Sequence, residues 1–279
     1  MNELTLLLTS VECGLIFSLP VLGMFLSSRV LKVDDMTLEG SFGLGGALTA
    51  LLLSNGVSPL VAMPLAMLAA GIAGLMTALL HTQLRLQVLM SGIIVTTALF
   101  SVNLLLAGAN ISLAAHQTIF KLCAFITDYK LLLLTLFALC CVLIIRWLLT
   151  TQVGFLLQAT GHNPRVVQAF AKSPAVFLTV GLVLANMLTG LAGSLLVQYV
   201  GFFSIWSSVG TIIVTLAGLM LADMLSTRVN AALIAGAIMY QLVIALTFEL
   251  QLNPNWNKLI TALFIVALLT GKKMMTEKN

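Results

Sequence analysis

The chain has very few charged residues. Its 279 residues include 13 lysines and arginines and 9 acidic residues, so only 8% are charged, whereas 60% are hydrophobic. A soluble domain normally has about a quarter of its residues charged. This shortage excludes a soluble fold and predicts a single all-α polytopic integral membrane domain over residues 1–279. The formal charge of +4 does not indicate nucleic-acid binding, because the basic residues lie between apolar runs.

Reactive motifs are also missing. The sequence contains no H-E-x-x-H, no G-x-S-x-G and no pair of aspartates inside an apolar run, which argues against an intramembrane enzyme. The cysteines have no metal-ligand spacing and are expected as buried small apolar residues: Cys13, Cys123, Cys140 and Cys141. We therefore expect no catalytic residue, no metal site and no cofactor. The first apolar run lacks the basic start of a cleaved signal peptide, so we expect it to remain as a span.

Apolar runs are what the sequence has in abundance. A spanning helix needs about 20 apolar residues. On that measure the candidates are Leu4–Leu26, Val57–Leu80, Val88–Ala109, Leu131–Leu149, Ala175–Tyr199, Ser208–Ala222, Val229–Phe248 and Leu259–Gly271, together with the short segment Ser41–Ser54. The sequence thus predicts about nine membrane segments. The short ones are typical of broken helices, whose irregular backbone is tolerated where protein or a water-filled pathway surrounds it.

Orientation follows from the basic residues, which gather in cytoplasmic loops. If Ser41–Ser54 crosses the membrane, most of them fall on one side, with the N-terminus outside and the C-terminus in the cytoplasm. If the segment only dips in and returns, that pattern breaks. We favour the crossing.

The segment "DDMTLEGSFGLGG" places acids directly before a glycine-rich apolar run. Glycines allow close approach of another backbone, and an ionisable group at membrane depth usually faces a cavity or a partner. Asp34 and Asp35 are expected at the lipid headgroups, capping the following helix. Glu39 could do the same, or line a pathway. Candidate translocation residues are Thr37, Glu39, Ser41, Gly43 and the mid-span amide Asn186. Glu12, inside the first span, is expected to face the subunit interior or to pair with a polar residue of a neighbouring helix.

The loop over residues 150–174 carries the marks of a short helix. Asn163 is a suitable N-cap, Pro164 fits the first helical position, and Lys172 would lie in the last turn. Val166, Val167 and Phe170 share one helical face by their spacing. Such a helix either lies in the lipid headgroups or docks into a groove of a cytoplasmic partner.

These residues also carry a family resemblance. The loop "ATGHNPRVVQAFAKSP" resembles the coupling segment of bacterial ABC-importer permeases of the branched-chain amino acid/ribose type. "MTLEGSFGLGGAL" resembles a segment of a subgroup labelled tryptophan/tyrosine transport permeases, and "VGTIIVTLAGLMLAD" is similar to a segment near the end of the same core. Two departures are Gln158, where arginine is usual, and the "AFAKSP" ending.

The resemblance implies a permease in the bacterial inner membrane. It would pair with a second permease copy or homologue, two cytoplasmic ATPase subunits and an extracytoplasmic solute-binding protein, with lipid around it. The chain has no phosphate-binding G-x-x-x-x-G-K-[ST] loop, so ATP would be hydrolysed on the separate subunits. The expected ATPase-coupling residues are Gly161, His162, Asn163, Pro164, Arg165, Val166, Val167 and Phe170. The expected solute is an amino acid or a similar amphiphile. An ion-coupled secondary transporter, which needs no docking loop, is the alternative.

Overall fold

The computed structural model describes residues 3–122, 129–225 and 229–249, with isolated positions 263, 266 and 270. It confirms the all-α polytopic fold. The long helices are α1 (Glu3–Met24), α2 (Thr37–Ser54), α3 (Pro59–Leu84), α4 (Val88–Ala107), α6 (Tyr129–Thr150), α9 (Pro174–Val200), α10 (Thr211–Leu225) and α11 (Val229–Glu249). The short elements are η1 (Phe25–Val30), β1 (Asn110–Ser112), α5 (Ile119–Leu122), α7 (Gln152–His162), α8 (Pro164–Ala169), β2 (Phe202–Ser204) and η2 (Ile205–Ser207).

Six helical segments in the described part of the chain are long and apolar enough to cross a membrane. They correspond to the runs predicted from Leu4, Val57, Val88, Leu131, Ala175 and Ser208. Helix α2, with 18 residues, and the apolar stretch Ala231–Thr247 of α11 come in addition. The run Leu259–Gly271 lies almost entirely outside the described residues.

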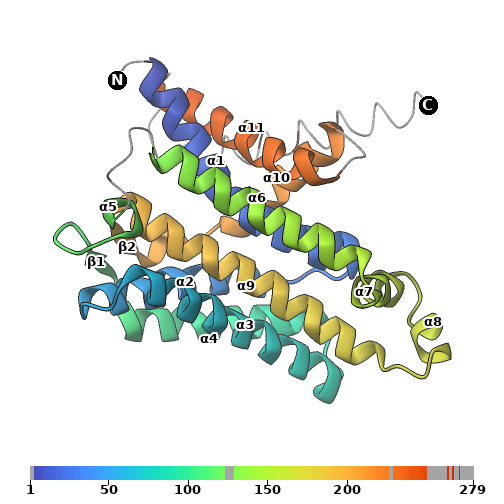
Figure 1. Ribbon diagram of the computed structural model, residues 1–279. Coiled ribbons are helices and arrows are strands. Elements are labelled where there is room, and N and C mark those ends of the chain that lie inside the picture. The colour runs from blue at the N-terminus through green and yellow to red at the C-terminus, as the bar shows by residue number, and fades with distance from the viewer. Residues whose placement is uncertain are drawn as a thin grey trace.

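The helices form two packed groups (Figure 1). In one, α9 packs against α2 and α3, and α4 covers α2; in the other, α1 packs against α6, α10 and α11. The contact of α1 with α9 joins the two groups. Helices α7 and α8 lie at one end of the molecule, and the strands β1 and β2 lie at the other (Figure 1). The two ends that a membrane would separate are therefore built differently.

Helix α2 lies at the centre of the first group. Its contacts with α9 advance four residues at a time on both helices, so the two helices run parallel. Ser41 bonds Asn186, a Cβ on Gly45 would lie 2.0 Å from the carbonyl oxygen of Gly190, and Thr49 bonds Ser194. The small side chains let the two backbones approach closely, as in other membrane helix pairs. Most of α2 is consequently buried within the chain.

The strands β1 and β2 form an antiparallel pair in which Ile111 faces Phe203. The pairing was not predicted. In the sequence, the stretch around "ISLAAHQTIFKL" suggested an amphipathic helix on the outer face, but only α5, four residues long, is helical there. Ile119 and Phe120 of α5 are buried, so this short helix packs into the chain.

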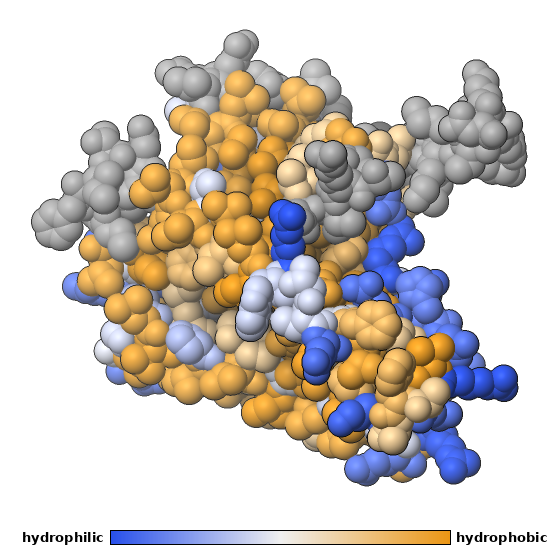
Figure 2. Space-filling model, turned by 45° about the vertical axis from the view of Figure 1, so that its right-hand side comes forward, coloured by the Kyte–Doolittle hydropathy of each residue, from blue (hydrophilic) through white to orange (hydrophobic). Residues whose placement is uncertain are grey.

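The outer surface is strongly apolar. Leu105, Leu132, Leu136 and Trp147 are each more than 60% exposed, which suits a surface covered by lipid. Figure 2 shows hydrophobic residues over most of the visible face, with hydrophilic side chains gathered towards its right-hand side. The distribution is that of a multi-pass membrane protein.

The cysteines differ in their exposure. Cys141 is buried, as expected, and Cys13 is half-buried. The expectation of burial is wrong for Cys140, which is exposed on the apolar outer side of α6. Cys123 lies outside the described residues.

Candidate functional site

The loop over residues 150–174, which was predicted to be cytoplasmic, forms the two short helices α7 and α8. Thr151 accepts a hydrogen bond from the N–H of Gly154 and caps α7, and Asn163 accepts one at 3.1 Å from the N–H of Arg165 and caps α8. Asn163 and Pro164 therefore occupy the predicted positions. Helix α8 ends at Ala169, however, so Lys172 lies beyond it rather than in its last turn. The left-handed backbone of Ala171, with φ of 54°, ends the helix.

The apolar face expected on α8 is only partly available. Val166 and Phe170 are 39% and 60% exposed, but Val167 is fully buried. The prediction that all three share an exposed face is wrong for Val167, because the helix packs this side of itself against the chain. The remaining predicted coupling residues His162, Asn163, Pro164 and Arg165 are exposed. The loop thus presents one aromatic and one aliphatic side chain among polar groups.

Gly161 faces inward. A Cβ at this position would lie 2.1 Å from the carbonyl oxygen of Val30 and 2.8–2.9 Å from backbone atoms of Leu31. Helix α7 therefore packs backbone to backbone against the end of η1, and only glycine fits this contact.

Between α1 and α2 the chain is irregular. Residues Phe25–Val30 form a π-helical turn, and Lys32 has the left-handed φ of 56°. The N–H of Leu31 donates to the carbonyl of Leu26, and that of Val33 to the carbonyl of Ser27. We call residues 31–36 the junction. π-Helical turns within helices occur frequently at functional sites.

The junction ends on a buried carboxylate. Asp35 is 1% exposed, accepts a hydrogen bond at 2.9 Å from the N–H of Thr37 and another at 2.8 Å from the side-chain amide of Asn186. As expected, Asp35 binds the start of α2, although the N-cap position itself is Met36; contrary to expectation, it is enclosed by protein rather than exposed to the headgroups. Asn186 lies near the middle of α9, and both residues are enclosed. Asp34, in contrast, is exposed.

Three of the predicted pathway residues belong to the same cluster. The hydroxyl of Ser41 donates to the carbonyl oxygen of Asn186 at 2.6 Å, and the hydroxyls of Thr37 and Thr77 lie 2.5 Å apart. Thr37, Ser41 and Asn186 are each 0% exposed. We call Asp35, Thr37, Ser41 and Asn186 the Asp35 cluster. Asp35, Ser41 and Asn186 bond one another, and Thr37 contacts Thr77 of α3, so in this conformation the cluster joins helices α2, α3 and α9.

The cluster also matters energetically. Among residues 3–122, 129–225 and 229–249, no lysine or arginine forms an ion pair with Asp35. Burying an ionised carboxylate without a partner is strongly unfavourable. Hydrogen bonds from Thr37 and Asn186 offset that cost, since an unmet buried polar group is unfavourable.

The other two predicted pathway residues lie on a different face of α2. Glu39 accepts a hydrogen bond at 2.9 Å from the N–H of Gly210, just before α10, and is partly exposed. A Cβ on Gly43 would lie 3.1 Å from Ser208 and 2.7 Å from the side-chain nitrogen of Asn103. This face of α2 therefore meets the start of α10 and the helix α4, whereas the face of Ser41 meets α9.

Beside Gly43 lies a narrow crevice between α2, α9 and the segment 202–208, lined in part by Phe42, Phe203, Ser204 and Ser208. Its free volume of about 20 Å³ suits one water molecule, not an amino acid. Nearby, the side-chain oxygen of Asn103 is buried without a partner. From the sequence, Asn103 can be recognised only as an amide within the apolar run Val88–Ala109.

Glu12 pairs with a polar residue of a neighbouring helix, which is one of the two alternatives expected from the sequence. The hydroxyl of Tyr199 in α9 donates to the Glu12 carboxylate at 2.7 Å, and Lys130 lies 5.9 Å from the centre of the Tyr199 ring. This contact joins α1 to α9 near the end that carries the strands. Separately, no group of three histidine, cysteine or acidic side chains in the described ranges could hold a metal ion.

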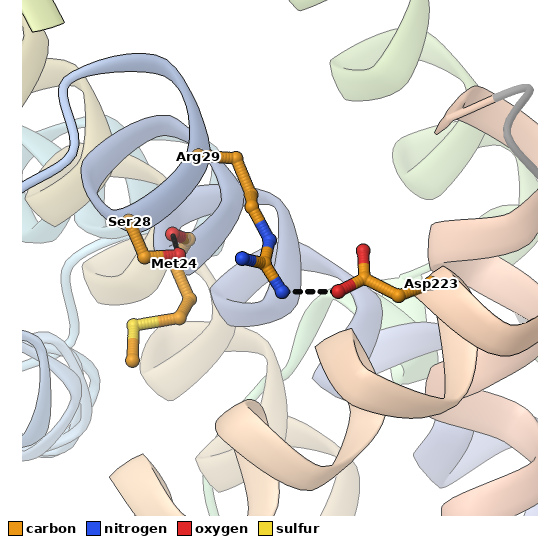
Figure 3. Close-up of polar contacts among 4 residues, drawn as sticks. All are labelled: Met24, Ser28, Arg29 and Asp223. Carbon is orange, nitrogen blue, oxygen red and sulfur yellow. Dashed lines mark hydrogen bonds and ion pairs between the residues drawn. The ribbon is translucent and has the colours of Figure 1, made fainter. Parts of the chain in front are cut away.

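An ion pair links η1 to α10. Arg29 of η1 contacts Asp223 near the end of α10, while the Ser28 hydroxyl donates to the carbonyl of Met24 (Figure 3). The side chains of Arg29 and Asp223 are 46% and 27% exposed. Partly exposed ion pairs of this kind contribute little and are weakened by salt.

Replacing Asp223 with asparagine is therefore expected to lower the free energy of unfolding by at most about 1 kcal/mol. Thermal unfolding in detergent at low and high salt measures this. The effect should shrink at high salt, and exchanging the two residues, Arg29→Asp with Asp223→Arg, should restore it. A large, salt-independent loss in Asp223→Asn would show that the carboxylate does more than form this pair.

Comparison of the sequence with known proteins finds a matching family and two relatives. The sequence model of the family described as "Branched-chain amino acid transport system / permease component" matches residues 6–269. A protein of Clostridioides difficile, named "Tyrosine transport system permease protein", is 31% identical over 95% of this chain and 91% of its own length. "Uncharacterized protein RP368" of Rickettsia prowazekii is 27% identical over 97% of this chain and 99% of its own.

No solved structure matches the chain significantly. The family match covers nearly all of the sequence, including α2, the loop of α7 and α8, and α9. The chain therefore belongs to the family of branched-chain amino acid transport system permease components, and it is a multi-pass transport protein of the ABC type.

Proposed function

We propose that this chain is the membrane-spanning subunit of an ATP-driven importer in the bacterial inner membrane, with its C-terminus in the cytoplasm. An extracytoplasmic binding protein delivers the solute, and separate ATPase subunits power alternating access. The chain works as a pair with a second copy or a homologue. Family membership supports this assignment.

The observation that carries the proposal is the shape of the α7–α8 end. Val166 on the capped helix α8 and Phe170 directly after it are exposed. Helix α8 lies at the end of the molecule, beyond the long helices (Figure 1). Exposed aromatic side chains on a rigid helix are typical anchors of protein interfaces. A soluble ATPase with a groove on its surface would bind this end by the helix-in-groove mode.

The solute is an amino acid, and tyrosine is the first candidate. The support is the name of the Clostridioides difficile relative, a tyrosine transport system permease. The alternative, an ion-coupled secondary transporter, has no use for α8 as a docking element.

Reconstitution tests the proposal. The permease, its ATPase subunit and the loaded binding protein are placed in liposomes, and uptake of radiolabelled tyrosine is followed with the ion gradients collapsed. Uptake that requires ATP and stops with a hydrolysis-deficient ATPase supports the importer. Uptake driven by an ion gradient without the ATPase would establish the secondary transporter.

The identity of the solute has its own measurement. Calorimetry of the binding protein with tyrosine, tryptophan, leucine and ribose is expected to show tight binding of an amino acid. Tight binding of ribose alone would overturn the amino-acid assignment and leave the importer assignment intact.

A further inference from the structure

The cytoplasmic loop and the centre of the membrane domain are joined by a short route. It begins at Gly161, whose backbone packs on Val30 and Leu31. A Cβ on Gly181 of α9 would lie 2.5 Å from Leu31 and 3.2 Å from Leu157 of α7, so Leu31 is wedged between α7 and α9. Leu31 and Leu157 are 3% and 0% exposed. Because this contact has no free space, a shift of α7 would have to move Leu31 as well.

The middle of the route is the junction. Because η1 is a π-helical turn and Lys32 is left-handed, α1 does not continue into α2 as one rigid helix. Only three residues lie between Leu31 and Asp35 in the sequence, so a movement of Leu31 cannot be taken up by slack chain. The carbonyl of Met36 is held at 2.7 Å by the hydroxyl of Thr96 in α4.

The route ends at the Asp35 cluster. Asp35 holds the first turn of α2 through the N–H of Thr37 and holds α9 through Asn186. Asn186 in turn accepts the hydroxyl of Ser41, one turn further along α2. The position of α2 relative to α9 is therefore fixed by a carboxylate that belongs to the junction.

We propose that Gly161 and Asp35 are positioning residues of the import reaction. A displacement of α7 by the ATPase passes through the junction to Asp35, which resets α2 against α9 and so changes access to the pathway. This inference rests on the proposed function. It assigns to the buried Asp35 a role that neither solute binding nor simple capping explains.

An exchange of two residues separates this role from mere stability. In Asp35→Asn, a side-chain amide faces the amide of Asn186, and donor meets donor. In Asn186→Asp, two carboxylates face each other. In the double variant, the new amide at position 35 still accepts from Thr37 and donates to the new carboxylate at position 186, which still accepts from Ser41. Only the bond from position 186 to the carbonyl of Leu182 is lost.

The experiment measures tyrosine uptake per ATP hydrolysed in liposomes, together with thermal stability and co-purification of the ATPase. Asp35→Asn and Asn186→Asp are each expected to lower uptake per ATP by about tenfold, the change expected for loss of one charged hydrogen bond. The double variant should recover most of it. Gly161→Ala should lower the ratio likewise while the ATPase still co-purifies. Thr97→Val, on the exposed side of α4 next to Thr96, is the matched control and should behave as wild type.

The possible results separate a failure of the proposed function from a failure of the positioning roles of Gly161 and Asp35. Absence of ATP-dependent uptake, or of ATPase binding, in the wild type would overturn the proposed function itself. Wild-type uptake per ATP in folded Asp35→Asn and Gly161→Ala would overturn the positioning roles of Gly161 and Asp35 and leave the proposed function intact. The same conclusion would follow if Asp35→Asn and Asn186→Asp both lowered uptake per ATP and the double variant did not recover it. The defect would then not come from the bond between positions 35 and 186.

Discussion

Replacing Gly45 with alanine is expected to force α2 away from α9 and to lower the free energy of unfolding by roughly 1–3 kcal/mol, the usual cost of overpacking, or more. The new methyl group would lie 2.0 Å from the carbonyl oxygen of Gly190 and 2.7 Å from two further backbone atoms. A side chain could rotate away, but a backbone cannot. Nor can α9 retreat, because a Cβ on Gly190 would itself lie 2.2 Å from Ala70 of α3.

Thermal unfolding of the purified protein in detergent measures this effect. The matched control is Ser101→Thr, which also adds one methyl group but lies on the exposed side of α4. We expect Gly45→Ala to unfold several degrees below wild type and Ser101→Thr to unfold with it. Equal midpoints for all three proteins would mean that α2 and α9 do not pack through these glycines.

The second large effect is expected on α8. Phe170→Ala removes the most exposed apolar side chain of the coupling loop, and Val166→Asp places a charge in the same contact. If Phe170 is an interface anchor, its loss should cost about 2 kcal/mol or more of binding energy, or roughly 30-fold in the dissociation constant for the ATPase. Uptake and solute-stimulated ATP hydrolysis should fall with it, whereas membrane insertion and thermal stability should not change.

Leu105→Ala is the control for this pair. Leu105 is 86% exposed and lies near the end of α4, away from the α7–α8 end, so its truncation should leave ATPase binding intact. Val167 is unsuitable for the test, because an aspartate there would be buried within the chain. If Phe170→Ala and Val166→Asp both transport and hydrolyse ATP at wild-type rates, α8 lies in the headgroups and is not the coupling element.

Local patterns in the sequence were sufficient for much of the fold. Six spans could be located because they are long and apolar, and the start of α8 could be located because Asn163 and Pro164 act on their nearest neighbours. The same reasoning led to the wrong environment for Asp35. Next to the exposed Asp34 it looks like a headgroup residue, and its partner Asn186 is 151 residues away. Nothing local in the sequence reports such a bond.

Val167 illustrates a second limit. Helical spacing shows which residues share a face, but not whether that face meets the chain itself or a partner. In a helix of six residues, neighbours such as Val166 and Val167 point about 100° apart, so one is exposed and the other buried. The pairing of β1 with β2 was missed for the same reason as the Asp35 bond. It joins segments that are far apart in the sequence.

The parallel contact of α2 with α9 has a consequence for biosynthesis. The partners of Ser41 and Thr49 lie 145 residues downstream. At 5–20 residues per second, a ribosome needs roughly 7–30 s to produce them. During that delay the nascent α2 has Gly45 without Gly190 beside it, and Asp35, before its first turn, lacks Asn186. Until α9 has been made, α2 can pack only against earlier helices such as α3 and α4. The membrane domain closes around its central helix only after the second half has been made.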